Sequence, residues 1–261
     1  MPKCGVRWSR YVAVGDSFTE GMDDPYPDGT YRGWADLVAS RLALDTPDFR
    51  YANLAIRGRL FPAVVAEQVP PALAMKPDLV SFAAGGNDVL RRSFDPDLLV
   101  HRFDEIIADF RGIGADVIVF RFADVMARLP GQRLIAPRVA ALNQAVGEIA
   151  GRRGAHLVDL FVDDEFLNPV MWGPDRLHLS ATGHRRVAGH VLTALRVQFD
   201  PQWMIPPERL PSARWLAARA ADARWAGQHL APWIKRRLTG RSSGDTVTAK
   251  RPTLDPLVDH A

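Results

Sequence analysis

Short apolar segments alternate along this chain with segments whose apolar residues recur at helical spacing. The apolar segments end at turn-forming residues, as buried strands do, and they span residues 10–15, 49–55, 78–84, 116–122 and 156–160. Helices are expected between and after them, over residues 33–44, 62–74, 95–112, 134–150 and 180–197. Because such alternation is typical of parallel strands joined by right-handed crossovers, the sequence predicts an α/β fold with a five-stranded parallel sheet and helices on both faces.

Composition excludes several classes of protein. The 261 residues are 47% hydrophobic and 24% charged, as in ordinary soluble globular proteins. No run of 18 apolar residues indicates a transmembrane helix, and Met1–Arg10 is not followed by an apolar segment long enough for a signal peptide. Cys4 is the only cysteine, which rules out an intrachain disulfide and gives no support for a cysteine-based metal site. A cytoplasmic location is the resulting expectation.

The net charge of +3 lies mainly in the last part of the chain. From Ile205 onward there are ten Lys and Arg but only five Asp and Glu, so the preceding residues are close to neutral. This distribution argues against nucleic acid as a partner of the main domain.

The first apolar segment ends abruptly in Gly15-Asp16-Ser17. In open α/β sheets, ligands bind beyond the carboxyl ends of the strands. A serine at that edge, on a tight turn before a helix, meets the conditions for a nucleophile. The tripeptide is also a common turn former, so the other strand ends have to support the assignment.

Other residues suited to acyl transfer follow the later strands. His178 can act as the base for Ser17, and Asp175, three residues earlier, can orient its imidazole. The backbone N–H groups of Ser17 and Gly58, with the Asn87 side-chain amide, can form an oxyanion hole. If the sheet is doubly wound, these groups converge at one edge.

These segments resemble the conserved blocks of the SGNH (GDSL-like) hydrolases. The four blocks appear in that family's order and lie within residues 11–184, and they read Gly15-Asp16-Ser17, Gly58, Gly85-Gly86-Asn87-Asp88 and Asp175-Arg176-Leu177-His178. The resemblance implies a flavodoxin-like three-layer α/β/α sandwich, a catalytic triad of Ser17, Asp175 and His178, an oxyanion hole of Ser17, Gly58 and Asn87, and no metal. Cofactors are not expected. Phe18 stands where that family's motif has leucine.

Several residues near these motifs can be explained without a catalytic role. His184 lies on the last helix and is expected to be structural or solvent-facing. Asp16 is expected to hold its turn rather than to be catalytic, and Asp88 to support the third loop rather than to act as an acid. Four arginines after strand ends either meet an anionic substrate or form a solvated rim: Arg57, Arg59, Arg91 and Arg92. Four apolar residues are candidates for an acyl pocket: Phe18, Met22, Phe61 and Trp172.

The chain divides into a hydrolase domain (1–200), a helical extension (201–239) and a tail (240–261) whose Ser, Gly, Thr and Pro content predicts disorder. In the extension, Ser212 is expected to cap a helix to Leu230, and a second helix to run from Pro232 to Leu238. It can pack on the domain, on a second subunit or, as a peripheral segment, on an anionic membrane. Since every catalytic candidate precedes residue 179, we expect hydrolysis of a small ester not to need it.

The sequence therefore predicts a serine hydrolase that cleaves a small-molecule carboxylic ester through an acyl-enzyme on Ser17. Two alternatives stay open. The same triad can transfer the acyl group to a sugar or another alcohol, or the domain can be a catalytically silent binding module.

Overall fold

A computed structural model describes residues 8–123, 132–209, 222, 224–230, 232 and 242–257. Its six-stranded sheet has the order β5-β4-β3-β1-β2-β6. The strands are β1 (Arg10–Gly15), β2 (Arg50–Asn53), β3 (Leu79–Ala83), β4 (Asp116–Arg121), β5 (His156–Asp159) and β6 (Arg251–Pro256). Strands β1 to β5 pair in parallel, while β6 runs antiparallel to β2. The α/β fold and its parallel five-stranded core are confirmed, with one further strand at the edge.

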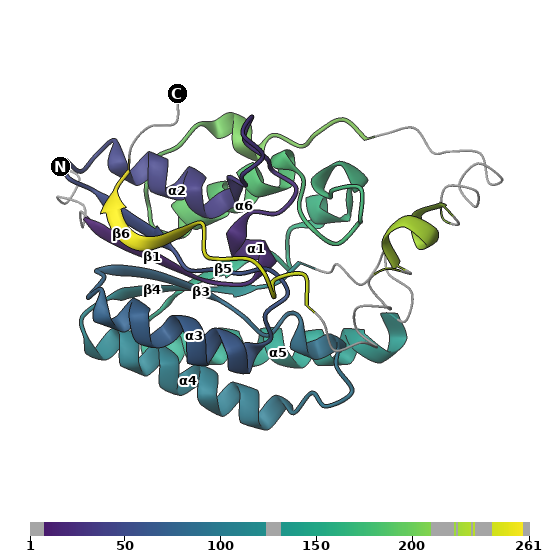
Figure 1. Ribbon diagram of the computed structural model, residues 1–261, viewed down its shortest axis with the longest axis horizontal. Coiled ribbons are helices and arrows are strands. Elements are labelled where there is room, and N and C mark those ends of the chain that lie inside the picture. Colours follow the sequence, from purple (N-terminus) through teal and green to yellow (C-terminus); the bar gives the residue numbers. More distant parts are fainter. Residues whose placement is uncertain are drawn as a thin grey trace.

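Helices cover both faces of the sheet (Figure 1). One face carries α3 (Phe61–Ala74), α4 (Pro96–Gly112) and α5 (Gln132–Arg153), and the other carries α2 (Gly33–Ala43) and α6 (Ala181–Ala194). The short helix α1 (Ser17–Glu20) follows β1 directly. This arrangement is the three-layer sandwich that the sequence predicts.

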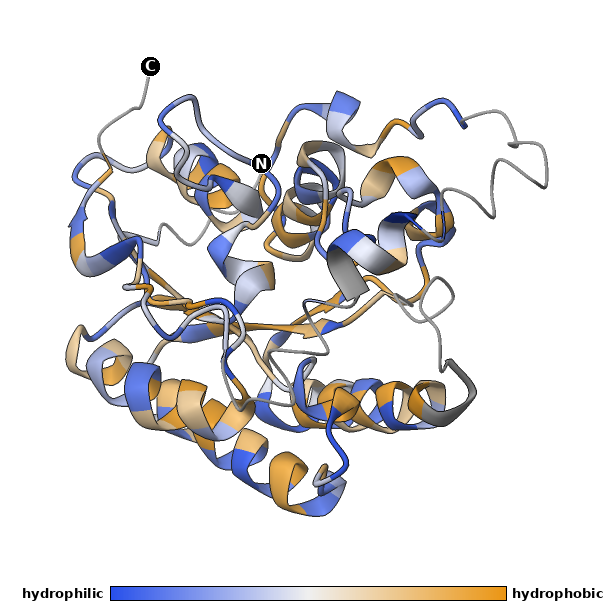
Figure 2. Ribbon diagram, turned by 45° about the vertical axis from the view of Figure 1, so that its right-hand side comes forward, coloured by the Kyte–Doolittle hydropathy of each residue, from blue (hydrophilic) through white to orange (hydrophobic). Residues whose placement is uncertain are grey.

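Each face of the sheet has its own hydrophobic core. Successive strand side chains point to opposite faces, so Tyr11 and Ala13 pack toward α2 and α6 while Val12 and Val14 pack toward α3, α4 and α5. In Figure 2 the central strands are largely orange, and the surrounding helices carry both colours, as amphipathic helices do. Doubly covered strands explain why the strand segments are nearly continuous apolar runs.

Helix α3 continues through Pro70 and Pro71 to Ala74, although proline disfavours the interior of a helix. Each proline removes one helical N–H donor, which leaves the carbonyls of Ala66 and Glu67 without a helical partner. Both residues are exposed, so water can satisfy those carbonyls.

Within the tail 240–261, for which disorder is expected, the described residues 242–257 include strand β6 and are ordered. Strand β6 pairs with β2 from Arg50↔Pro256 to Asn53↔Arg251. The preceding residue, Lys250, is 13% exposed and places its Nζ 2.8 Å from Oδ1 of the buried Asp36, with further hydrogen bonds to the carbonyls of Tyr31 and Arg32. Pairing at the sheet edge and this ion pair fix a segment whose composition alone is typical of disorder.

The helices expected from Ser212 to Leu230 and from Pro232 to Leu238 lie mostly outside the described residues. Within them, Ala226–Leu230 form a helical turn. Among the helices that the structure describes, none is both long and apolar enough to cross a bilayer.

Candidate active site

Ser17 lies where β1 gives way to α1, and it is 9% exposed, at the wall of a pocket rather than on the open surface. The end of β1 is held by Gln68 of α3, which accepts from the Gly15 N–H and donates to the Gly15 carbonyl, both at 2.9 Å. Gly15 itself has no room for a side chain, because a Cβ there would overlap Thr19 and the Ala83 carbonyl. These contacts fix the backbone from which Ser17 projects.

Asp16 caps α1 and binds Asn87. One carboxylate oxygen accepts from the Phe18 N–H at 3.1 Å, and the other accepts from Asn87 Nδ2 at 3.0 Å. The same Asn87 nitrogen donates to the Arg59 carbonyl at 3.0 Å. Burial raises the pKa of Asp16 to about 6, against the lowering effect of the Phe18 hydrogen bond. The expectation that Asp16 holds its turn is confirmed, and Asn87 connects the first three strand ends.

Asp175 and His178 form a hydrogen-bonded pair in the loop before α6. Asp175 Oδ2 lies 2.5 Å from His178 Nδ1, and Oδ1 accepts from the backbone N–H groups of Leu177 and His178 at 2.9 and 3.0 Å. Burial alone would raise the pKa of Asp175, but these hydrogen bonds hold it well below its usual range. Burial opposes protonation of His178, yet the bond and charge of Asp175 raise the pKa of this imidazole overall.

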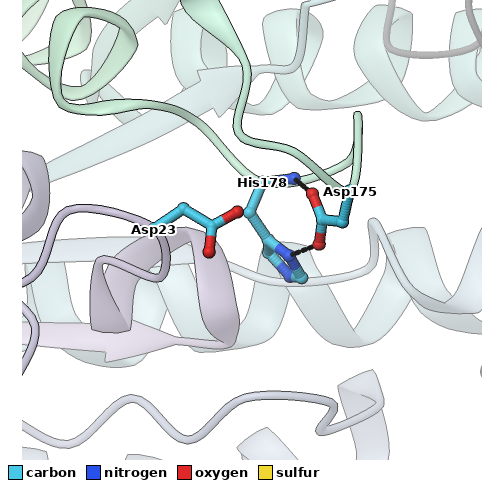
Figure 3. A group of neighbouring side chains, drawn as sticks. All are labelled: Asp23, Asp175 and His178. Carbon is cyan, nitrogen blue, oxygen red and sulfur yellow. Dashed lines mark hydrogen bonds and ion pairs between the residues drawn. The ribbon is translucent and has the colours of Figure 1, made fainter. Parts of the chain in front are cut away.

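Asp23 lies on the other side of His178 from Asp175 (Figure 3). One potential ligand atom from each of the three residues lies within 4.8 Å of the others. A cation bound there would compete with the hydrogen bond that orients the imidazole. The charge of Asp23 instead adds to that of Asp175 in raising the pKa of His178.

One pocket connects the catalytic candidates. Ser17, Asn87 and His178 all line it. The rest of its wall is mostly apolar and comes from both faces of the sheet, including Val89, Leu90, Phe122, Leu142, Phe166 and Leu179. Phe18 and Trp172 also line it, as expected, whereas Met22 and Phe61 do not. Phe61 instead stacks with Phe103 in the core below the sheet.

Gly58 is not among the residues that line this pocket. It has a φ of +71°, which a residue with a side chain rarely adopts, and Ser242 and Ser243 occupy the space that a Cβ would need. The structure thus brings Ser17, Asn87 and the Asp175–His178 pair together, and it places Gly58 at the junction with the C-terminal segment.

The arginines of this turn already have acidic partners. Arg57 forms an ion pair with the buried carboxylate of Glu20, which also accepts from the Arg57 N–H at 2.7 Å. Arg59 pairs with Glu67 at 2.9 Å and lies 3.9 Å from Asp245. The contacts of Arg57 and Arg59 therefore match neither alternative, contact with an anionic substrate or a solvent-exposed rim. Both side chains instead hold the turn in place.

The expected structural roles of His184 and Asp88 are confirmed. His184 Nδ1 accepts from the Trp34 N–H at 3.2 Å, and its Nε2 lies 2.9 Å from the Met22 carbonyl, so the imidazole is neutral. Burial lowers its pKa to about 4. Asp88 accepts from the Phe61 N–H at 2.8 Å, at the start of α3.

Sequence reasoning missed residues that hold these loops. Gln68 is a polar residue on the buried face of an apolar helix, and that position was a signal for a specific partner. Trp225 donates from Nε1 to the Asp175 carbonyl at 3.0 Å, and Asp222 pairs with Arg176 at 2.8 Å. No local pattern indicates that these extension residues contact the catalytic loop.

Comparisons with known proteins find esterases that this chain resembles. Esterase TesA from Pseudomonas aeruginosa is 28% identical over 195 residues, which cover 71% of this chain and 87% of that protein. A crystal structure of TesA aligns with a TM-score of 0.57 over 71% of this chain and 97% of its own. A variant of Axe2, an acetyl xylan esterase from Geobacillus stearothermophilus, is 20% identical and shares the fold, with a TM-score of 0.62 over 74% of this chain and 96% of its own.

A model of the GDSL-like lipase/acylhydrolase family matches residues 13–186, about two thirds of the chain. The match includes the segments that carry Ser17, Gly58, Asn87, Asp175 and His178, and it ends before the C-terminal extension. The chain belongs to the GDSL-like lipase/acylhydrolase family, a family of ester-hydrolysing enzymes.

Proposed function

We propose that this protein hydrolyses carboxylic esters through an acyl-enzyme on Ser17, with His178 as base and Asp175 as its orienting acid. The observation that carries the proposal is the 2.5 Å hydrogen bond between Asp175 and His178, on a loop whose histidine lines the same pocket as Ser17 and Asn87. Esterase activity in the relative TesA supports the reaction class.

The mechanism follows from the roles of these groups. Ser17 Oγ attacks the ester carbonyl while its proton passes to His178 Nε2, and the imidazolium is stabilised by Asp175. The proton then goes to the departing alcohol as the C–O bond breaks and the acyl-enzyme forms. Water then attacks the acyl-enzyme as the same histidine takes its proton, and the histidine returns that proton to Ser17 Oγ as the acyl C–O bond breaks and the acid is released.

The oxyanion formed in each step needs preorganised donors. We assign this role to the Ser17 and Gly58 backbone N–H groups and to Asn87 Nδ2. The Asn87 amide donates to Asp16 and Arg59 in the structure. It must therefore share or exchange one of these bonds as negative charge develops on the substrate.

The apolar wall of the pocket favours an apolar acyl group. Each methylene of the acyl chain that is buried in the pocket stabilises the bound state by about 0.8 kcal/mol. Across p-nitrophenyl esters from acetate to dodecanoate, we expect kcat/KM to rise about tenfold or more between acetate and hexanoate, and then to level off. A steady fall of kcat/KM from acetate onward would contradict this substrate class.

Water and an alcohol compete as acyl acceptors on the same acyl-enzyme. If the protein is an acyltransferase, an added sugar or other alcohol will appear as its ester in the products, at the expense of the free acid. A silent binding module would instead give no turnover with any ester of the series. Product analysis in that series therefore separates the proposed hydrolase from both alternatives.

The rate should depend on pH through His178, which must be neutral to accept the serine proton. Because the pKa of His178 is raised above 6.5, kcat/KM should fall on acidification with a midpoint above pH 6.5. Asp23→Asn removes one of the charges that raise this pKa, so the midpoint should move to lower pH. Asp97→Asn, an exposed change on α4, is the matched control. A midpoint that Asp23→Asn leaves in place would contradict the assigned influence of Asp23.

A further inference from the structure

The C-terminal segment 242–257 lies on the turn that carries Gly58. A Cβ on Gly58 would overlap Ser242 Oγ, and a Cβ on Gly244 would overlap the Arg57 carbonyl oxygen and come within 2.9 Å of the Ile56 side chain. Gly244 is buried in this contact. The turn after β2 therefore cannot move outward unless the C-terminal segment moves with it.

The same contact extends toward Asn87. The side chain of Asp245 accepts from the Ser242 N–H at 2.8 Å, which closes the 242–245 turn, and it lies 3.9 Å from Arg59 Nη1. Arg59 in turn offers its carbonyl to Asn87 Nδ2 at 3.0 Å. Two of the assigned oxyanion donors, on Gly58 and Asn87, thus adjoin residues that the C-terminal segment contacts.

The segment is anchored strongly enough to hold that turn. Its strand β6 pairs along β2, the strand from which the Gly58 turn emerges. Lys250 lies between the 242–245 turn and β6, and its Nζ is 2.8 Å from the buried Asp36 carboxylate. In Figure 1 this segment, in yellow, leads along the sheet into β6.

Part of the preceding extension contacts the loop that carries Asp175 and His178. Trp225 donates to the Asp175 carbonyl at 3.0 Å, and the Arg176 guanidinium lies 4.9 Å from the centre of the Trp225 ring while pairing with Asp222. The Asp175–His178 loop and the turn that carries Gly58 are therefore both in contact with residues that follow the matched family region.

We propose that residues 242–250 are a positioning element of the active site. They hold the Gly58 turn so that the Gly58 N–H and the Asn87 amide face the developing oxyanion. The inference rests on the proposed function. It replaces the expectation that hydrolysis is independent of the C-terminal tail.

Gly244→Ala tests the inference, because the added methyl group pushes the segment away from Arg57. The φ of Gly244 lies outside the left-handed region, so alanine can adopt the backbone conformation. We expect kcat for p-nitrophenyl butyrate to fall ten- to hundredfold, since a displacement of about 1 Å can cost that much, while KM changes less than about twofold. The rate of labelling by a fluorophosphonate should fall in parallel, because that reaction also needs the oxyanion hole.

Two further variants complete the test. Gly227→Ala, at an exposed position with open space around it, is the matched control and should keep wild-type kcat. Asp245→Ala opens the 242–245 turn from an exposed position and should lower kcat by a smaller factor, which keeps the test decisive if Gly244→Ala does not fold. Circular dichroism and the thermal midpoint confirm folding of each variant.

Wild-type kcat in folded Gly244→Ala, or in Asp245→Ala if Gly244→Ala does not fold, would overturn the inference. A rise in KM with kcat unchanged would also overturn it. Failure of the proposed function is distinguishable, because the wild-type protein would then show neither hydrolysis nor labelling that depends on Ser17.

Discussion

Ser17→Ala should lower kcat for ester hydrolysis by about 10⁴–10⁶, because removal of the nucleophile abolishes the acyl-enzyme route. The fold should persist, since the change removes a single oxygen and the surrounding backbone is fixed by Gln68 and Asp16. Initial rates with p-nitrophenyl butyrate, with the thermal midpoint measured on the same sample, check both expectations.

Ser93→Ala is the matched control for this prediction. Ser93 is exposed in the loop after Asn87, so its substitution should leave the rate at the wild-type value. If folded Ser17→Ala protein turned over ester within tenfold of wild type, Ser17 could not be the nucleophile.

Asn87→Ala should lower kcat by about 10²–10³ with a modest change in KM, because its amide acts mainly on charge that develops in the transition state. The variant also deprives the buried Asp16 carboxylate of a hydrogen bond at 3.0 Å. The pKa of Asp16, already raised to about 6 by burial, should therefore rise further. Steady-state kinetics over a range of ester concentrations separate kcat from KM.

Comparison with Asp88→Asn shows whether the loss at Asn87 is chemical or structural. Asp88 supports the same loop by accepting from the Phe61 N–H, so its substitution should change stability more than kcat. An Asn87→Ala variant in which KM alone changed would mean that this amide binds substrate and does not stabilise the oxyanion.

The sheet, its helices and the Asp175–His178 pair could be predicted because their signals are local. The Gly15-Asp16-Ser17 turn ends an apolar strand, and the spacing from Asp175 to His178 permits the observed hydrogen bond within one loop. Parallel strands then bring their carboxyl ends to a common edge. The short apolar runs and their order therefore contain most of the information about the domain.

The C-terminal segment could not be predicted because its partners are distant in sequence. Strand β6 contains Pro252 and Pro256, which argue against a central strand. At the edge they are tolerated, since only one side of β6 pairs, with β2. The attraction between Lys250 and Asp36 likewise joins residues that no local pattern connects. The cytoplasmic location and the membrane or self-association of the extension stay predictions.

Mapping the site of a covalent phosphonate adduct tests the central assignment most directly. After reaction of the full-length protein with a fluorophosphonate, intact mass and peptide mass spectrometry should find one adduct per chain, located on Ser17, with hydrolysis lost in proportion to labelling. An adduct on another residue, such as Ser242, or continued hydrolysis by fully labelled protein would contradict the account.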